Sequence, residues 1–185
     1  MENNQNSGRR TGTIRLAKMG MLVAIAVVLV YLIHFPILPM LPFMEYDPAD
    51  VPIMIGTFAF GPLAGIVLTA VTCLVQGLTV SASSGVYRII MHFVATGTYV
   101  LVAGLIYYKH KSRKSAVIAL IAATVAVVIV MVPANYFITS AFMGVDKSVI
   151  LQLMPFIMLF NLIKMGANSI ITFLLYKRIS GFLHR

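Results

Sequence analysis

Long apolar runs, separated by short polar segments, make up most of the chain. Five such runs cover residues 16–35, 51–80, 86–108, 116–142 and 149–176. A helix needs about 20 apolar residues to cross the hydrocarbon core of a bilayer, and every run is at least that long. The pattern therefore predicts helices that span a membrane.

The run at 51–80 is long enough to contain a turn, and the pair Gly61-Pro62 lies near its middle. Proline inside a helix removes a backbone hydrogen bond and clashes with the preceding turn. We therefore expect two short helices that meet near Phe60–Pro62. The spacing Gly61-x-x-x-Gly65 is one that lets a membrane helix pack closely on a neighbour.

Lysine and arginine gather in three clusters, at residues 9–18, 109–114 and 177–185. Cytoplasmic loops of membrane proteins carry an excess of these residues. All three clusters lie on one side only if the run at 51–80 crosses the membrane twice. The sequence therefore predicts an all-α protein, an integral membrane bundle of six transmembrane helices with both termini in the cytoplasm.

Composition agrees with this interpretation. Of 185 residues, 60% are hydrophobic and 10% are charged, whereas soluble domains have roughly a quarter charged residues. The net charge of +9 fits cytoplasmic loops and gives no reason to expect nucleic-acid binding. The first run is too long for the apolar region of a signal peptide, so we expect a retained helix. We expect a single membrane domain, residues 1–185, with a polar tail at 1–13 and the bundle at 14–180, surrounded by the lipid of the cell membrane.

Three polar residues lie deep in the last run. Asn161, Lys164 and Asn168 have spacings of i, i+3 and i+7, so they share one helical face. Lys164 is 12 residues from Tyr176, or roughly 18 Å above the inner end of the helix, which is too far for its side chain to reach the surface. No Asp or Glu lies inside a predicted span, so we expect a ligand or water to solvate Lys164.

Asn135 lies at a similar depth on the preceding helix. It follows Val117 by 18 residues, which places it roughly 27 Å above the inner face, and Asn161 comes out at roughly 22 Å. Pro133 predicts a kink just below Asn135. Asparagines often only tie helices together, but two amides and one ammonium at converging depths favour a binding site with several hydrogen-bond donors.

Two other features of the outer half have two interpretations each. Arg88 and His92 lie one turn apart and either contact a ligand or serve as a snorkelling cation and a structural histidine. The first outer loop, residues 34–50, is apolar, contains four prolines and carries Glu45, Asp47 and Asp50. This loop predicts a lid over a pocket, formed near Glu45, and also a packing role in which Asp50 caps the next helix.

Catalytic and nucleotide-binding motifs are missing from the sequence. It contains no P-loop, no H-E-x-x-H, no G-x-S-x-G and no Cys/His spacing typical of metal sites. We therefore expect no enzyme activity, no metal and no cofactor. A small membrane protein with an outward pocket and no energy source of its own indicates a binding subunit.

Several segments match a known family. They are the segment Glu45–Pro52, the segment Gly56–Gly65, the segment Met91–Gly97, Asn135-Tyr136-Phe137, and Pro155 with Phe160–Lys164. With them the chain resembles, over nearly its whole length, the substrate-binding S components of energy-coupling factor (ECF) vitamin transporters. The Asp-Pro-Ala-Asp segment and the Asn-x-x-Lys pair resemble the riboflavin-specific members.

The resemblance implies a fold, a ligand and partners. It implies a six-helix bundle whose first outer loop covers riboflavin, with Asn135, Asn161 and Lys164 at the polar edge of the isoalloxazine ring. The substrate-binding residues expected from the resemblance and the polar pattern together are Met44, Glu45, Tyr46, Arg88, His92, Asn135, Asn161, Lys164 and Asn168. Gly20-x-x-x-Ala24 corresponds to the family's small-residue contact with a transmembrane coupling subunit, and two ATPase subunits complete such transporters in prokaryotic plasma membranes.

Other functions stay open from the residues alone. Within the family, the ligand could instead be another vitamin, such as a pterin or a thiamin derivative. A stand-alone carrier or channel belongs to a different class, and flux into vesicles without partner subunits would favour it. A membrane enzyme is the third alternative.

Overall fold

The computed structural model describes residues 2–79 and 85–183, and this part of the chain is almost entirely helical. The helices are α1 (Glu2–Leu32), α2 (Asp50–Phe60), α3 (Pro62–Leu78), α4 (Gly85–Lys109), α5 (Arg113–Ala134), α6 (Ser140–Met143) and α7 (Lys147–Leu183), with a π-helical turn, η2 (Asn135–Thr139), between α5 and α6. Two short strands, β1 (Phe35–Pro36) and β2 (Glu45–Tyr46), pair antiparallel within the loop from α1 to α2. The sequence did not predict these strands.

The predicted break of the 51–80 run is confirmed. Helix α2 ends at Phe60, and α3 begins at Pro62, where proline needs no hydrogen-bonded N–H. Between them Gly61 has φ 96°, a conformation that favours glycine. Gly65 then allows close packing of the two helices, because a Cβ placed on it would lie 2.3 Å from Oγ1 of Thr57.

Within the described residues, four helices are long and apolar enough to cross a membrane, by length and composition. They are Gly12–Leu32, Val86–Lys109, Arg113–Met143 and Lys147–Tyr176. Helices α2 and α3 have 11 and 17 residues, or lengths of about 16 and 26 Å against a hydrocarbon core of about 30 Å. Large apolar side chains cover the outside of the bundle, Leu63 being 82% exposed, as expected of a surface in contact with lipid.

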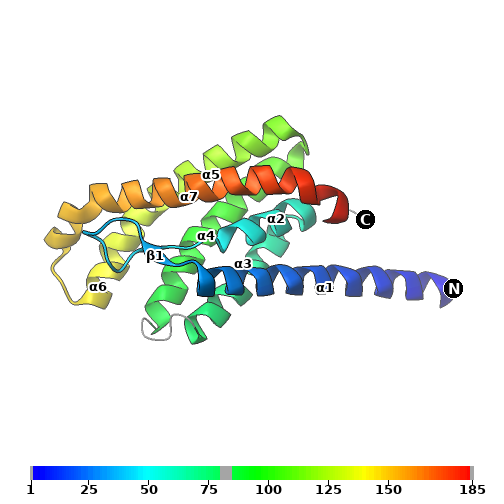
Figure 1. The fold of residues 1–185 in the computed structure, drawn as a ribbon, viewed down its shortest axis with the longest axis horizontal. Helices are drawn as coiled ribbons and strands as arrows, with labels where there is room; N and C mark the ends of the chain where they lie inside the picture. The colour runs from blue at the N-terminus through cyan, green and yellow to red at the C-terminus, as the bar shows by residue number, and fades with distance from the viewer. Residues whose placement is uncertain (1, 80–84, 184–185) are drawn as a thin grey trace.

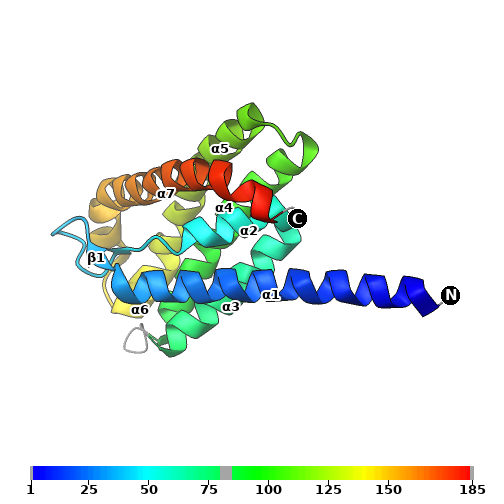
Figure 2. The ribbon, with the colours of Figure 1, turned by 45° about the vertical axis from the view of Figure 1, so that its right-hand side comes forward.

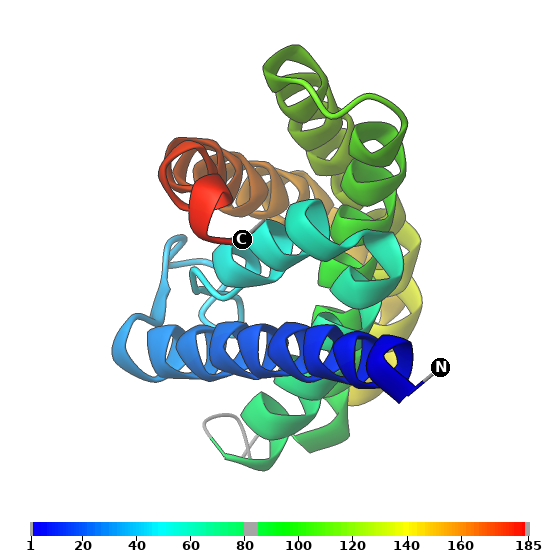
Figure 3. The same ribbon diagram turned by 90° about the vertical axis from the view of Figure 1, so that its right-hand side faces the viewer.

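The two ends of the bundle are formed by different segments of the chain. Both termini and the turn between α4 and α5 lie at one end, and the β1–β2 loop and α6 lie at the other (Figures 1 and 2). The α2–α3 turn lies near the first end, because the Arg15 side chain donates to the Phe60 carbonyl at 3.0 Å. The loop that contains β1 and β2 lies between α1 and α7 (Figure 3).

Candidate functional site

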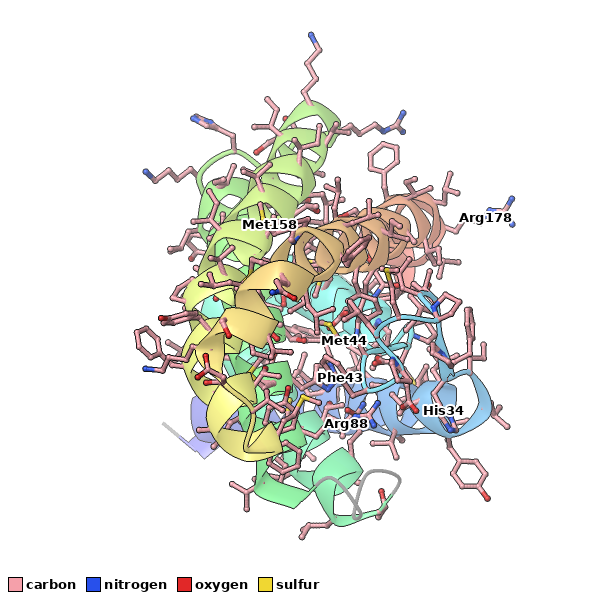
Figure 4. All side chains as sticks on the ribbon, turned by 90° about the vertical axis from the view of Figure 1, so that its left-hand side faces the viewer. His34, Phe43, Met44, Arg88, Met158 and Arg178 are labelled. Atoms are coloured by element: carbon pink, nitrogen blue, oxygen red, sulfur yellow. The ribbon has the colours of Figure 1, made fainter. Side chains whose placement is uncertain are left out.

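A small cavity lies under the β1–β2 loop, between that loop and helices α4, α5 and α7. It encloses about 90 Å³. Figure 4 views the molecule from the end that carries the β1–β2 loop. Phe43, Met44 and Arg88 lie close together near the centre of that view. Seven of the nine sequence-predicted substrate residues line the cavity, namely Met44, Glu45, Arg88, His92, Asn135, Asn161 and Lys164.

The loop reaches this position because its apolar residues pack inside the bundle. Leu41 is fully buried in a cluster with Ile150, Ile157 and Phe160. Backbone bonds from the Leu41 N–H to the Leu38 carbonyl, at 2.9 Å, and from the Met44 N–H to the Leu41 carbonyl, at 3.0 Å, bend the loop tightly. Met44 and Glu45 are thereby held over the cavity.

Lys164 has a buried acidic partner, so the expectation that it needs a ligand or water because no acid is available was wrong. Its ammonium lies 2.8 Å from Oδ2 of Asp47, and the two residues are 7% and 4% exposed. Asp47 belongs to a loop that the sequence placed outside the membrane, but the loop folds back into the bundle. Each charge of such a buried pair is compensated only by its partner, so loss of either residue leaves an uncompensated charge.

Asp50 does not cap α2, contrary to the packing interpretation of the loop. The N-cap residue is Ala49, which has no side-chain cap, and its N–H donates to Oδ1 of Asp47 at 3.1 Å. Asp50 is the first helical residue and is fully buried. Its two carboxylate oxygens accept from Thr96 Oγ1 at 2.6 Å and from Asn168 Nδ2 at 2.9 Å, so Asp50 links α2 to α4 and α7.

Asn168 and Tyr46, the other two predicted substrate residues, lie behind the cavity wall and do not line it. The Tyr46 hydroxyl donates to Oδ1 of Asn168 at 2.9 Å. Nδ2 of Asn168 donates to Oδ2 of Asp50 at 2.9 Å and to the Asp47 carbonyl at 3.2 Å. Burial, with the nearby Asp47 carboxylate, raises the pKa of the Tyr46 hydroxyl, which keeps it a donor. This pair joins the loop to α7.

Asn135 and Asn161 each keep hydrogen-bonding capacity toward the cavity. Their Nδ2 atoms donate to the carbonyls four residues earlier, Met131 and Ile157, both at 2.8 Å. Each amide nitrogen has a second N–H, and within the described residues Oδ1 of Asn161 accepts no hydrogen bond. Instead of a simple kink, Pro133 is followed by the π-helical turn that begins at Asn135, a feature often found at functional sites.

Arg88 and Glu45 close the outer side of the cavity as an ion pair, and both side chains are 26% exposed. Arg88 is therefore not simply a snorkelling cation. One turn deeper, Nε2 of His92 lies 3.6 Å from Oδ1 of Asp50 and makes no hydrogen bond to any described residue. Donor atoms of Asp47, Asp50 and His92 lie within 4.8 Å of one another, a spacing that could hold a metal ion, but the Lys164 ammonium supplies positive charge there.

Sequence reasoning missed most of the apolar lining of the cavity and one of its two acids, Asp47. Tyr87, Met91, Met131, Phe160 and Met165 line the cavity. Met91 is three residues from Arg88, and Met165 is four residues from Asn161, so helical spacing from the polar residues could have found both. Asp47 carried no periodic signal because it lies in a loop.

Comparison with known families gives one match that covers most of the chain. The family described as "ECF transporter, substrate-specific component" matches residues 14–176. "Riboflavin transporter RibU" of Staphylococcus aureus (strain TCH60) is 35% identical over 179 residues, which cover 92% of this chain and 93% of the relative. "Riboflavin transporter FmnP" of Bacillus subtilis (strain 168) is 28% identical over 123 residues, or 66% of this chain and 64% of the relative.

Two solved structures share the fold. One is described as "Structure and mechanism of the S component of a bacterial ECF transporter"; it has 35% identity and a TM-score of 0.81, covering 94% of this chain and 99% of the other. The second is FolT bound with folic acid, at 21% identity and a TM-score of 0.61 over 88% of this chain and 92% of the other. At that identity the second likeness concerns the fold alone.

Proposed function

Because this chain belongs to the substrate-specific components of ECF transporters, we propose that it is the riboflavin-binding subunit of such a transporter. It is a multi-pass protein of the bacterial cell membrane and a transport component, not an enzyme. The observation that carries the choice of vitamin is the 35% identity to a riboflavin transporter over 92% of the chain. ATP hydrolysis would be the task of two partner ATPase subunits.

The chemistry of the cavity supports a flavin. The pyrimidine edge of isoalloxazine presents two carbonyls and one N–H between them, so it needs donors and one acceptor. The spare N–H groups of Asn135, Asn161 and Lys164 are donors, and Oδ1 of Asn161 is an acceptor. Glu45 and Arg88 also line the cavity, and in this proposal they would bind the hydroxyls of the ribityl chain.

Four methionines supply an adaptable apolar surface for the ring system. Met44, Met91, Met131 and Met165 all line the cavity, and methionine side chains rearrange readily around a ligand. Rearrangement is required, since a cavity of about 90 Å³ is well below the roughly 300 Å³ of small-molecule pockets. We infer that the β1–β2 loop acts as a lid that shifts outward when the vitamin enters.

Tyr46 and Asn168 have a different role in this proposal. Both are committed to hydrogen bonds that join the loop to α7. They would hold the lid and the Lys164 side chain in place, and His92 would contact the ligand from α4, since it lines the cavity.

The proposed topology has six crossings with both termini in the cytoplasm. Its support is the gathering of the termini, the α4–α5 turn and Gly61 at one end of the bundle, since these segments carry or adjoin the basic clusters. Helix α2, with 11 residues, is shorter than the hydrocarbon core is thick. Gly20 and Ala24 lie exposed on α1, where the transmembrane coupling subunit would pack.

The test is the absorbance spectrum of the full chain purified in mild detergent, followed by titration with riboflavin, folate and thiamin. Flavin bands in the purified protein, or quenching of riboflavin fluorescence with no effect of the other vitamins, is the expected result. Preference for folate or thiamin would change the ligand within the same family. Uptake of riboflavin by vesicles that contain only this chain would contradict the requirement for partner subunits.

A further inference from the structure

A second cavity lies at the turn between α4 and α5, at the end of the bundle away from the vitamin site (Figure 1). It encloses about 420 Å³, within the range of small-molecule pockets. Lys109, His110 and Lys114 form its polar wall, and Leu105 and Ile118 form its apolar wall.

The polar wall carries positive charge that no described residue neutralises. Lys109 and Lys114 make no ion pair or hydrogen bond to any other residue that the structure describes, and the segment 105–118 contains no Asp or Glu. The Ser112 side chain at the rim accepts from the Ser115 N–H at 3.1 Å, so its own proton is free to be donated. Two lysines and a hydroxyl around one cavity are complementary to a phosphate group.

The other two cations of the turn point elsewhere. The Lys111 ammonium lies 5.4 Å from the centre of the Tyr108 ring, and neither Lys111 nor Arg113 lines the cavity. The turn therefore has two cations that face the cavity and two that do not, although all four lie within six residues.

The apolar wall opens toward the outside of the bundle. Leu105 and Ile118 are 53% and 60% exposed, and both lie on membrane-spanning helices next to the charged wall. A free phosphate ion would leave this surface unused, whereas the acyl chains of a phospholipid would cover it. Basic pockets between helices at the cytoplasmic side of a membrane commonly hold anionic lipid headgroups.

We propose that the cavity at the α4–α5 turn binds the phosphodiester headgroup of an anionic phospholipid. Lys109 and Lys114 contact the phosphate, and Leu105 and Ile118 contact the first methylenes of the acyl chains. The site goes beyond the vitamin-binding function and does not depend on it. It would fix the height of this turn at the membrane surface.

The experiment compares two double variants of the full chain, Lys109→Ala/Lys114→Ala and Lys111→Ala/Arg113→Ala. Both remove two positive charges from the same turn, so only a cavity-specific site separates them. Native mass spectrometry in detergent, with phosphatidylglycerol or phosphatidylcholine added, measures retained lipid. We expect the first variant to lose phosphatidylglycerol affinity by roughly tenfold or more, and the second to lose little.

Three results would overturn the proposal. Equal losses of phosphatidylglycerol affinity in both variants would indicate only nonspecific attraction of the anionic lipid to a basic turn. Equal retention of phosphatidylcholine by the unmodified protein would remove the preference for an anionic headgroup. Inorganic phosphate binding as tightly as phosphatidylglycerol would replace the lipid by the free ion. Unchanged thermal unfolding of both variants serves as the control for folding, whatever the ligand of the vitamin site.

Discussion

The ammonium of Lys164 lies 2.8 Å from Oδ2 of Asp47, a residue 117 positions earlier in the sequence, and both side chains are buried. This ion pair fixes the loop before α2 to the last helix at the edge of the proposed vitamin site. Both residues of the pair line the cavity. Lys164 therefore both holds the loop and lines the proposed site.

Asp47→Asn is expected to destabilise the protein strongly. The change keeps the size of the side chain but leaves the Lys164 charge buried without a counter-charge, which typically costs about 3–5 kcal/mol. Thermal unfolding in detergent measures the loss. Asp47→Asn/Lys164→Met removes both charges and should recover part of the stability, because the uncompensated charge is gone.

The matched control for that change is Asp146→Asn. Asp146 is an acid just before α7 whose Oδ1 accepts from the Ser148 N–H at 2.8 Å in an exposed setting. We expect this variant to unfold within about 0.5 kcal/mol of the unmodified protein, since exposed polar changes have small effects. If Asp47→Asn proves equally harmless, the Asp47–Lys164 pair does not hold the loop.

Asn161→Ala and Lys164→Ala should each weaken riboflavin binding by about 1–3 kcal/mol, through loss of buried hydrogen bonds to the ligand. Fluorescence titration measures the change in Kd. Asn161→Ala is the cleaner variant, because Lys164→Ala also leaves Asp47 unpaired. Gln76→Ala removes a buried amide that does not line the cavity and should leave the affinity unchanged. Full affinity in both site variants would exclude Asn161 and Lys164 from the binding site.

Tyr46 gives a prediction about pH. Its pKa is raised in the folded chain, first by burial and then by Asp47, so the unfolded chain loses this proton at a lower pH than the folded chain. The contribution of Tyr46 to stability is therefore complete below about pH 9 and falls as pH rises above about pH 10. Tyr46→Phe, which cannot ionise, should show a smaller loss of stability as the pH rises above about 10. Identical pH profiles of the two proteins would indicate that the fold does not raise the pKa of the Tyr46 hydroxyl.

Regular helical geometry explains which parts of the site could be predicted from sequence. The rise per residue is nearly constant, so counting from the helix ends brought Asn135, Asn161 and Lys164 to the outer half of the bundle, and all three line the cavity. The break at Gly61 followed equally from the chemistry of proline and glycine. These inferences needed no knowledge of how the helices pack.

The loop before α2 could not be derived in the same way. Its path depends on Leu41 packing under the loop and on Tyr46 pairing with Phe35, contacts that have no period in the sequence. Asp47 and Asp50 were therefore placed outside, although both are buried. Asn168 was assigned to the correct helical face, but its partners come from that unpredicted loop, so its place behind the cavity could not be foreseen.

Ala24→Trp should separate ligand binding from assembly. Ala24 and Gly20 are exposed on α1, and a Cβ added to Gly20 would meet no atom within 4 Å, so a bulky residue on this face fits the isolated chain. Close helix–helix contacts in membranes require small residues, and a tryptophan at the contact would hold the coupling subunit away. We expect unchanged riboflavin affinity in detergent and loss of co-purification with the coupling and ATPase subunits. The control is Val28→Trp, one turn further along the same exposed face, outside the Gly20-x-x-x-Ala24 spacing. Retained assembly with Ala24→Trp would move the coupling contact to another helix.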